Sequence, residues 1–367
     1  MSQDLIQQNY AQSPQLQKLQ NAIANTDATT FLKGLIGSSL SFVLAEIFKK
    51  ADTPFLLIFN DKEEAAYYLN DLEQLIGDKD VLFYPGSYRR PYQIEETDNA
   101  NVLLRAEVLN RINSRKKPAI IVTYPDALFE KVVTRKDLEK NTLKIKLEDS
   151  LSLDFLNEVL FEYKFKRVDF VTEPGEFSVR GGIVDVFSFS NDEPYRLEFF
   201  GDEVDSIRTF DVETQLSKEK VTKITIIPNV ENKFLNETRE SFLKYISANT
   251  IVFSSDLDLL FDRLDSFFEK AEEAFKKLST EIKHAEPEAL FVNSSSLKSQ
   301  LNDFKLFTSG NANLNSEKAE ILFQTNPQPS FNKKFDLLIE NLNENFEKGY
   351  TNYLFCATEQ QAKRFHD

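Results

Sequence analysis

The sequence has very few residues that bind metals or form disulfides. Its only histidines are His284 and His366, and its only cysteine is Cys356. One thiol cannot form an intrachain disulfide or a cysteine-rich metal site, and so little cysteine is typical of a reducing cytosol. With only two histidines, we expect neither a zinc site nor a Ser-His-Asp triad. We therefore expect a cytoplasmic protein that holds no metal.

Long hydrophobic runs are also missing. No stretch of about 18 apolar residues occurs, so the sequence predicts no membrane-spanning helix. The first residues after Met1 are Ser2, Gln3 and Asp4, and they lack the basic and then apolar segments of a signal peptide.

Positive charge is scarce as well. Lysine and arginine total 44 against 59 aspartate and glutamate residues, so the net charge is −15. Proteins that follow the phosphates of DNA do so with lysine and arginine, which release counterions. The overall charge therefore disfavours a DNA-binding surface, although a local basic patch stays open.

The composition is that of a folded protein of more than one domain. Hydrophobic residues make up 41% of the 367 residues and charged residues 28%. These proportions exclude an intrinsically disordered chain, and the length predicts two or three domains.

Residues 1–141 alternate short apolar runs with amphipathic segments, which is typical of an α/β domain with a parallel sheet. We expect strands at 55–59, 81–84 and 119–123, and helices over 5–25, after the N-cap Asp61 and over 96–112. Residues Phe31 to Phe48 are expected to form a loop that leads into a helix.

From residue 142 to 225 short strands and turns dominate, which predicts a small antiparallel α+β domain. The expected strands are 168–171, 183–189, 195–200 and 203–210. A strand at 224–227 should return to the first domain, so the small domain is expected to be an insertion. Residues 226–312 would complete the first domain, with a helix at 234–246, a strand at 250–253 and a helix at 256–283.

The last part of the chain is expected to be a linker followed by the start of another domain. Residues 313–330 are rich in asparagine and proline, which is typical of a linker. A helix at 331–346 and a strand at 353–355 should follow. About 40 residues without a disulfide or metal rarely fold alone, so we expect the natural protein to continue beyond residue 367.

Gly34, Gly37 and Ser41 match part of the phosphate-binding pattern G-x-x-G-x-G-K-[ST]. Ser39 replaces the last glycine and Leu40 replaces the lysine that contacts the β and γ phosphates. One interpretation is a degenerate P-loop, formed by Gly34, Gly37, Ser38, Leu40 and Ser41, that binds no nucleotide. The other is a Gly-Ser turn that happens to precede a helix.

Residues 173–187, EPGEFSVRGGIVDVF, and 195–208, YRLEFFGDEVDSIR, form the longest recognisable motif. This motif resembles the second domain of the bacterial repair protein UvrB, and more closely the matching domain of the transcription-repair coupling factors. The resemblance implies a helicase-type first domain of the UvrB kind with a small UvrB-type domain inserted in it. It also implies that the small domain docks onto the damage sensor UvrA.

The same resemblance favours the degenerate P-loop over a chance turn. In UvrB this loop binds ATP, whereas in the coupling factors it is inactive and ATP is handled by motor domains further along the chain. Residues 85–92 resemble a loop shared by both families, but residues 93–98 leave no room for the DNA-clamping hairpin of UvrB. Arg89 and Arg90 in this loop could contact phosphate or be solvated surface residues.

Strand alternation separates two faces along residues 195–200. Tyr195, Leu197 and Phe199 should face the core, and Arg196, Glu198 and Phe200 the opposite side. An aromatic beside an arginine on a polar face is typical of a protein interface. The alternative is that Phe200 packs under a loop or helix and Arg196 pairs with Asp205 or Glu198.

The resemblance assigns the partner-binding residues one by one. It implies that Arg180, Arg196 and Phe200 face UvrA, with Glu198 and Glu203 nearby. Asp185, Asp202, Glu203 and Asp205 show no metal-ligand spacing, so we expect no metal there. We also expect no cofactor and no catalytic residue.

The expected function is that of a UvrA-recruiting module rather than an enzyme. The resemblance implies a full protein that recognises stalled RNA polymerase and displaces it with an ATP-driven DNA translocase. Contacts with RNA polymerase and DNA would lie in regions absent from this chain. Two alternatives stay open: an active UvrB-like ATPase that binds damaged DNA, and an autoinhibitory domain that packs on the protein's own C-terminal motor domains.

Overall fold

The computed structural model describes most of the chain. The described residues are 2–25, 29–87, 99–114, 117–140, 142–189, 191, 193–227, 238–278, 285–309, 318–332, 334–356 and 358–366. Arg89 and Arg90, the two candidates for phosphate contact, lie outside the described residues.

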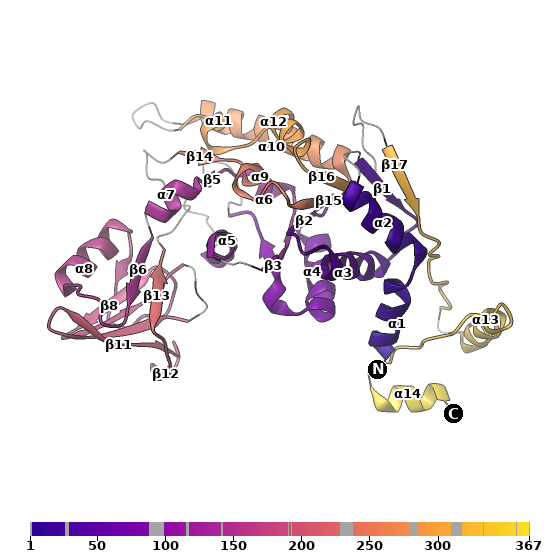
Figure 1. Cartoon of the computed structure of the whole chain (residues 1–367), viewed down its shortest axis with the longest axis horizontal. Coiled ribbons are helices and arrows are strands. Elements are labelled where there is room, and N and C mark those ends of the chain that lie inside the picture. Colours follow the sequence, from indigo (N-terminus) through magenta and orange to yellow (C-terminus); the bar gives the residue numbers. More distant parts are fainter. Residues whose placement is uncertain are drawn as a thin grey trace.

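A seven-stranded sheet, parallel at every described pairing, forms the centre of the molecule (Figure 1). Its strands, in order across the sheet, are β17 (Lys318–Leu322), β1 (Thr29–Lys33), β16 (Lys305–Thr308), β15 (Ile251–Ser254), β2 (Phe55–Ile58), β4 (Ile120–Thr123) and β3 (Val81–Tyr84). The three apolar runs predicted near 55, 81 and 119 form β2, β3 and β4. The expected loop at Phe31 is wrong, because Phe31 lies within strand β1.

Helices cover both faces of this sheet because its strands are apolar on both sides. Phe55 and Leu57 of β2 pack on one layer, and Leu56 and Ile58 on the other. The first layer contains α1 (Ser2–Ala11), α2 (Pro14–Asn25), α3 (Ser39–Ala51) and α4 (Lys62–Ile76). The second contains α5 (Asn99–Ser114), α6 (Pro125–Phe129), α9 (Phe242–Tyr245), α10 (Leu257–Lys276) and α12 (Ser294–Leu301).

Local signals explain where several helices begin and end. Asp61 caps α4 as predicted, since its Oδ1 accepts a hydrogen bond from the Glu64 amide at 2.8 Å. The helix expected over 5–25 is two helices, and the break precedes Pro14, whose ring cannot continue α1. The expected helix 234–246 is wrong over its described part: residues 239–240 form strand β14 and only α9 is helical. Residues 257–276 of the helix expected over 256–283 form α10.

A second sheet of six strands stands beside the first (Figure 1). Its order is β12 (Ser217–Lys220), β11 (Glu203–Phe210), β10 (Tyr195–Phe200), β9 (Ile183–Val186), β8 (Glu176–Arg180) and β7 (Lys166–Arg167). Its neighbours are antiparallel except β7 and β8. The strand expected at 168–171 is wrong, because the backbone leaves β7 after Arg167 and the Asp169 carbonyl accepts from side chains of β8.

Helix α8 (Leu153–Glu162) packs on the inner face of this second sheet. Leu156 and Leu160 are fully buried there with Phe177 and Leu197, and each such side chain contributes about 2 kcal/mol to folding. The short ribbon of β6 (Leu143–Lys146) and β13 (Lys223–Ile226) lies between the two sheets (Figure 1). The strand predicted near 224–227 is thus present, and it pairs with β6.

The predicted fold class is confirmed. The parallel sheet is built from residues before 124 and after 250, and the antiparallel-rich sheet comes from the residues between. The remaining elements are η1 (Asp78–Asp80), β5 (Val132–Val133), α7 (Arg135–Lys140), β14 (Arg239–Glu240) and α11 (Pro287–Leu290). Within the described ranges, no helix combines the length and the apolar character needed to cross a membrane.

The C-terminal part follows β17, which places residues 318–322 of the expected linker in the parallel sheet. Helices α13 (Phe335–Glu347) and α14 (Glu359–His366) then lie at the end of the molecule farthest from the six-stranded sheet (Figure 1). The strand expected at 353–355 is wrong, since these residues are in no regular element.

Candidate functional site

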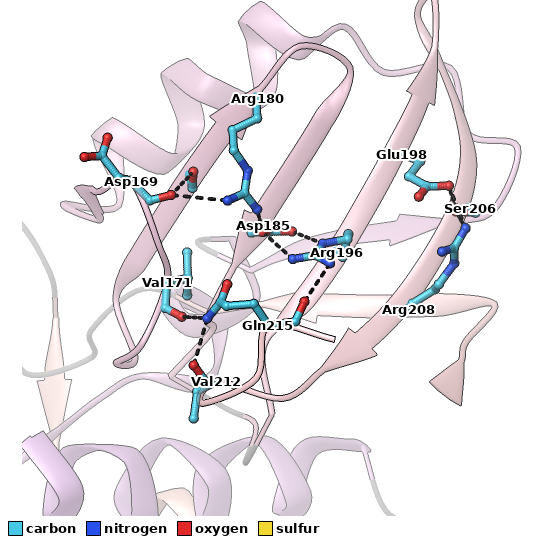
Figure 2. A network of polar contacts seen from close by, with 11 residues as sticks. Asp169, Val171, Arg180, Asp185, Arg196, Glu198, Ser206, Arg208, Val212 and Gln215 are labelled. Carbon is cyan, nitrogen blue, oxygen red and sulfur yellow. Dashed lines mark hydrogen bonds and ion pairs between the residues drawn. The ribbon is translucent and has the colours of Figure 1, made fainter. Parts of the chain in front are cut away.

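The outer face of the six-stranded sheet, opposite α8, carries two rows of mostly polar side chains in register. One row runs across β8 to β12 through Ser178, Asp185, Arg196, Arg208 and Lys220. The neighbouring row contains Arg180, Ile183, Glu198 and Ser206. We call this surface the outer face; Figure 2 shows its ion pairs. Register alone therefore gathers three arginines and two carboxylates from four strands.

Asp185 is the centre of this arrangement. Its side chain is 1% exposed, and its Oδ1 and Oδ2 accept from Arg196 Nε at 2.7 Å and Nη2 at 2.9 Å. Arg196 also donates to the Gln215 carbonyl at 3.1 Å and lies 4.6 Å from the centre of the Phe210 ring. Hydrogen bonding to Asp185 raises the pKa of the Arg196 guanidinium. Arg196 thus pairs with neither Asp205 nor Glu198, the acids that the alternative interpretation named.

Arg180 shares the same carboxylate. Its Nη2 donates to Asp185 Oδ2, and its Nη1 donates to the Asp169 carbonyl at 3.4 Å. The guanidinium lies 5.5 Å from the centre of the Phe170 ring. The Arg180 side chain is 40% exposed, whereas that of Arg196 is 15% exposed. Arg180 is therefore the more accessible of the two arginines on Asp185.

Glu198 forms a second ion pair on the outer face. Its Oε2 accepts from Arg208 Nη2 and from the Ser206 hydroxyl, both at 2.7 Å. The two charged side chains are half-buried. This pair neutralises Arg208, which stands directly opposite Arg196 in the register.

Phe200 lies at the tip of the β10–β11 hairpin and is 84% exposed. The alternative that it packs under a loop or helix is therefore wrong. Gly201 adopts φ 64° in the turn, a conformation that favours glycine, and Phe200 pairs with the exposed Glu203. The Leu151 amide donates to the Asp202 carbonyl at 2.7 Å, which braces the tip. Phe200 is thus presented to solvent by a supported turn.

The structure brings the five expected partner-binding residues onto one sheet, but it gives them different surroundings. Phe200 and Glu203 are exposed at the hairpin tip, Arg180 and Glu198 are accessible in part, and Arg196 is mostly enclosed. The sequence interpretation missed Asp185 as the shared partner of Arg180 and Arg196, and it missed Phe170. The signal for Asp185 was a single acid in the apolar strand 183–187, which lies between the strands that carry Arg180 and Arg196. Within the described residues no cluster of acids, histidines or cysteines forms a metal site.

The glycine-containing loop 34–41 comprises the turn after β1 and the first residues of α3, the place of a P-loop in a strand–loop–helix unit. Its polar groups are used within the protein. The Ser39 hydroxyl donates to the Ile36 carbonyl at 2.7 Å and accepts from the Ile36 amide at 2.8 Å. The Ser41 hydroxyl is buried and donates to Asp71 at 2.7 Å, and Leu40 lies in the core.

Residues after β17 run against the same loop. The Phe323 amide donates to the Lys33 carbonyl at 2.7 Å, and Thr325 donates to the Gly34 carbonyl through its amide at 3.2 Å. A Cβ added at Gly34 would come within 1.9 Å of the Phe323 carbonyl oxygen. The first turn of the loop is therefore closed by protein backbone, and Gly34 permits this approach at φ 75°.

A buried ion pair supports the loop after β3. Arg105 is fully buried, lies 3.4 Å from Glu130, donates to the Pro85 carbonyl at 2.8 Å and stacks on Tyr84 at 4.4 Å. Glu130 accepts from the Ser87 amide at 2.8 Å. These contacts fix residues 85–87, the last described before the segment that contains Arg89 and Arg90.

Comparison with known proteins identifies a family that the segment containing the six-stranded sheet resembles. Residues 143–231 match the model of the UvrB interaction domain. The chain is 31% identical over 229 residues to the transcription-repair-coupling factor of Bacillus subtilis, which covers 62% of this chain and 19% of that protein. It is 30% identical over 194 residues to that of Escherichia coli, covering 53% of this chain and 17% of the relative.

The factor of Staphylococcus aureus is 33% identical over 201 residues, or 54% of this chain and 17% of its own length. The match thus spans about a fifth or less of the length of these curated relatives. The resemblance to transcription-repair coupling factors over more than half of this chain is therefore confirmed.

Proposed function

We propose that this chain is a UvrA-recruiting module of the transcription-repair-coupling-factor kind, and that it binds UvrA through the outer face and Phe200. The matched interaction domain runs from β6 past β13 and so includes every strand of the six-stranded sheet. The five residues that the resemblance assigns to the partner all lie on this sheet.

The observation that best supports the proposal is that Phe200 is exposed on a sheet whose arginines are held in place by Asp185. A phenylalanine that is 84% exposed does little for folding, and it stands at a braced turn on the sheet that also carries the arginines held by Asp185. Exposed aromatics and arginines with fixed geometry are the residues that most often dominate binding energy. This surface is preorganised for binding, because Asp185 already holds the Arg196 side chain in place.

We infer that the wider role is to link stalled RNA polymerase to nucleotide excision repair in the cytoplasm. Contacts with RNA polymerase and DNA, and the ATP-dependent translocation of the full protein, would belong to regions absent from this chain. The relatives are about five times longer than the match, which leaves room for such regions in them.

We propose that this chain itself hydrolyses no ATP. The Ser41 hydroxyl is bound to Asp71, Leu40 is buried where the pattern requires a lysine, and backbone at Phe323 closes the loop at Gly34. An active UvrB-like ATPase would need these groups free for phosphate and magnesium.

The proposed division into domains follows the two sheets. The first domain comprises residues 1–141 and 226–312, the UvrA-binding domain 142–225, and a further domain starts at 331 after the segment 313–330. Strand β17 within that segment would attach it to the first domain.

Calorimetric titration with UvrA from the same organism tests the function. We expect saturable binding by the wild-type chain and at least tenfold weaker binding by Phe200→Ala. Phe346→Ala is the matched control, since Phe346 is 76% exposed on α13, far from the outer face, and its loss should leave the affinity unchanged. A folded wild-type chain that does not bind UvrA would overturn the proposal and favour packing on the protein's own motor domains.

A further inference from the structure

Phe170 is a second exposed aromatic on the outer face. It is 60% exposed in the loop after β7, and the preceding residue, Asp169, accepts hydrogen bonds from Ser178 and Arg180 of β8 through its carbonyl. These bonds hold the loop over the outer face. The position of the Phe170 ring is therefore set by backbone contacts, although the ring itself is largely in water.

The Phe170 ring and Asp185 together hold Arg180. The guanidinium lies 5.5 Å from the ring centre, within the range of a cation–π contact, and Nη2 donates to Asp185. Figure 2 shows the Asp169 carboxylate turned away from Arg180, so only the carbonyl of that residue meets it. Arg180 thus has a fixed direction while 40% of its side chain stays accessible.

The charges around Arg180 do not balance. Asp185 forms ion pairs with both Arg180 and Arg196, and Glu198 forms one with Arg208. Three guanidinium groups therefore share two carboxylates. Arg196 makes two hydrogen bonds to Asp185 and is mostly enclosed. The excess positive charge is therefore accessible at Arg180, on a chain whose net charge is −15.

We propose that Phe170 and Arg180 form a second anchor of the docking surface, which takes a carboxylate side chain of the partner with an apolar group beside it. This inference rests on the proposed function, since the partner is UvrA. The carboxylate meets the free edge of the Arg180 guanidinium, and the apolar group covers the exposed face of the Phe170 ring. Asp185 prevents Arg180 from tilting away.

The second anchor is close enough to Phe200 to belong to one interface. Arg180 and Glu198 share a row, two strands apart, and Phe200 follows two residues along β10. With strands about 4.8 Å apart and about 3.4 Å per residue, the separation is about 10 Å across the sheet and about 7 Å along it. A standard interface of about 800 Å² per partner spans more than this.

A double-mutant cycle on the UvrA affinity tests the second anchor. We expect Phe170→Ala and Arg180→Ala each to weaken binding about tenfold, and the double variant to be little weaker than either single one, because each change disables the same anchor. Phe170→Ala combined with Phe200→Ala is the control pair. Its fold-loss of UvrA affinity should be the product of the two single fold-losses. Arg180→Ala should also reduce the dependence of affinity on salt, whereas Phe170→Ala combined with it should reduce that dependence no further.

The results separate this inference from the proposed function. If the wild-type chain binds UvrA and Phe200→Ala weakens it, but Phe170→Ala binds as the wild type does, the second anchor is wrong and the function stands. Independent, multiplying losses for Phe170 and Arg180 would also refute the anchor as a unit. If the wild-type chain fails to bind UvrA, both proposals are wrong. Urea unfolding of each variant shows that the chain is folded, and the midpoint for Phe170→Ala is expected close to that of the wild type.

Discussion

Arg196 and Asp185 form a two-point ion pair across strands β10 and β9, with Nε to Oδ1 at 2.7 Å and Nη2 to Oδ2 at 2.9 Å. The pair is enclosed: the Asp185 side chain is 1% exposed and that of Arg196 15%. Arg196 therefore contributes to the fold as well as to the surface that we propose for UvrA. A loss of binding in an Arg196 variant has to be separated from a loss of stability.

Asp185→Ala should destabilise the protein by about 3 kcal/mol, because it leaves two arginines without their shared carboxylate and one of them is largely buried. Urea denaturation measures the change. Glu198→Ala is the control, since its pair with Arg208 is more exposed and its loss should cost less than about 1 kcal/mol. Equal effects of the two substitutions would show that the enclosure of Asp185 has no energetic consequence.

Restoring the lysine of the P-loop pattern should not restore nucleotide binding. Leu40→Lys places a charge in the apolar core around α3 and should destabilise the protein by at least about 2 kcal/mol. Ser41 would still be bound to Asp71 and the loop still closed at Gly34. A fluorescent ATP analogue is expected to bind neither the wild type nor the variant. Micromolar binding by the wild type would instead support the UvrB-like ATPase.

The buried pair of Arg105 and Glu130 should be among the most sensitive positions of the first domain. Glu130→Ala removes the carboxylate from a fully buried guanidinium and an acceptor from the Ser87 amide, which should cost about 3–5 kcal/mol. Differential scanning calorimetry measures it. Replacing both residues with apolar ones, Arg105→Met with Glu130→Leu, should recover part of the loss, and no recovery would contradict the assignment of the cost to the unpaired charge.

Tyr163, at the end of α8, predicts a change of stability at high pH. Burial, with the nearby Glu162 charge, raises its pKa to about 12, above the value of about 10 in an unfolded chain. Between pH 10 and 12 the unfolded chain loses this proton more readily than the folded protein does, so stability falls by at most about 1.4 kcal/mol per pH unit. The Tyr163→Phe variant should lack this contribution. Parallel stability curves for the two proteins from pH 10 to 12 would exclude it.

Strands with continuous apolar runs could be predicted from the sequence, and so could the alternating strands β10 and β11, whereas β1 and β17 could not. β2, β3 and β4 are short apolar runs, buried on both faces. β1 and β17 carry threonine, lysine and glutamate, and Thr30 is buried only because β1 pairs with β16 and β17, about 280 residues later in the chain. Local composition contains no information about such distant pairing.

The same limit applies to the candidate site. Alternation predicted that Arg196, Glu198 and Phe200 share a face, since a strand has a period of two residues. The pairing of Arg196 with Asp185 depends on the register of β9 against β10, and the stacking of Arg180 on Phe170 depends on the loop after β7. Nearby acids such as Glu198 and Asp205 were equally good partners by sequence spacing alone.

Amide hydrogen exchange of the chain, alone and with UvrA, tests the central proposal most directly because it locates the contact. We expect slower exchange in the loops that border the outer face, residues 168–175, 200–203 and 211–216, and no change in α8 on the opposite side or in the loop 34–41. Protection confined to α8 or to α13, with those three loops unchanged, would contradict docking through the outer face.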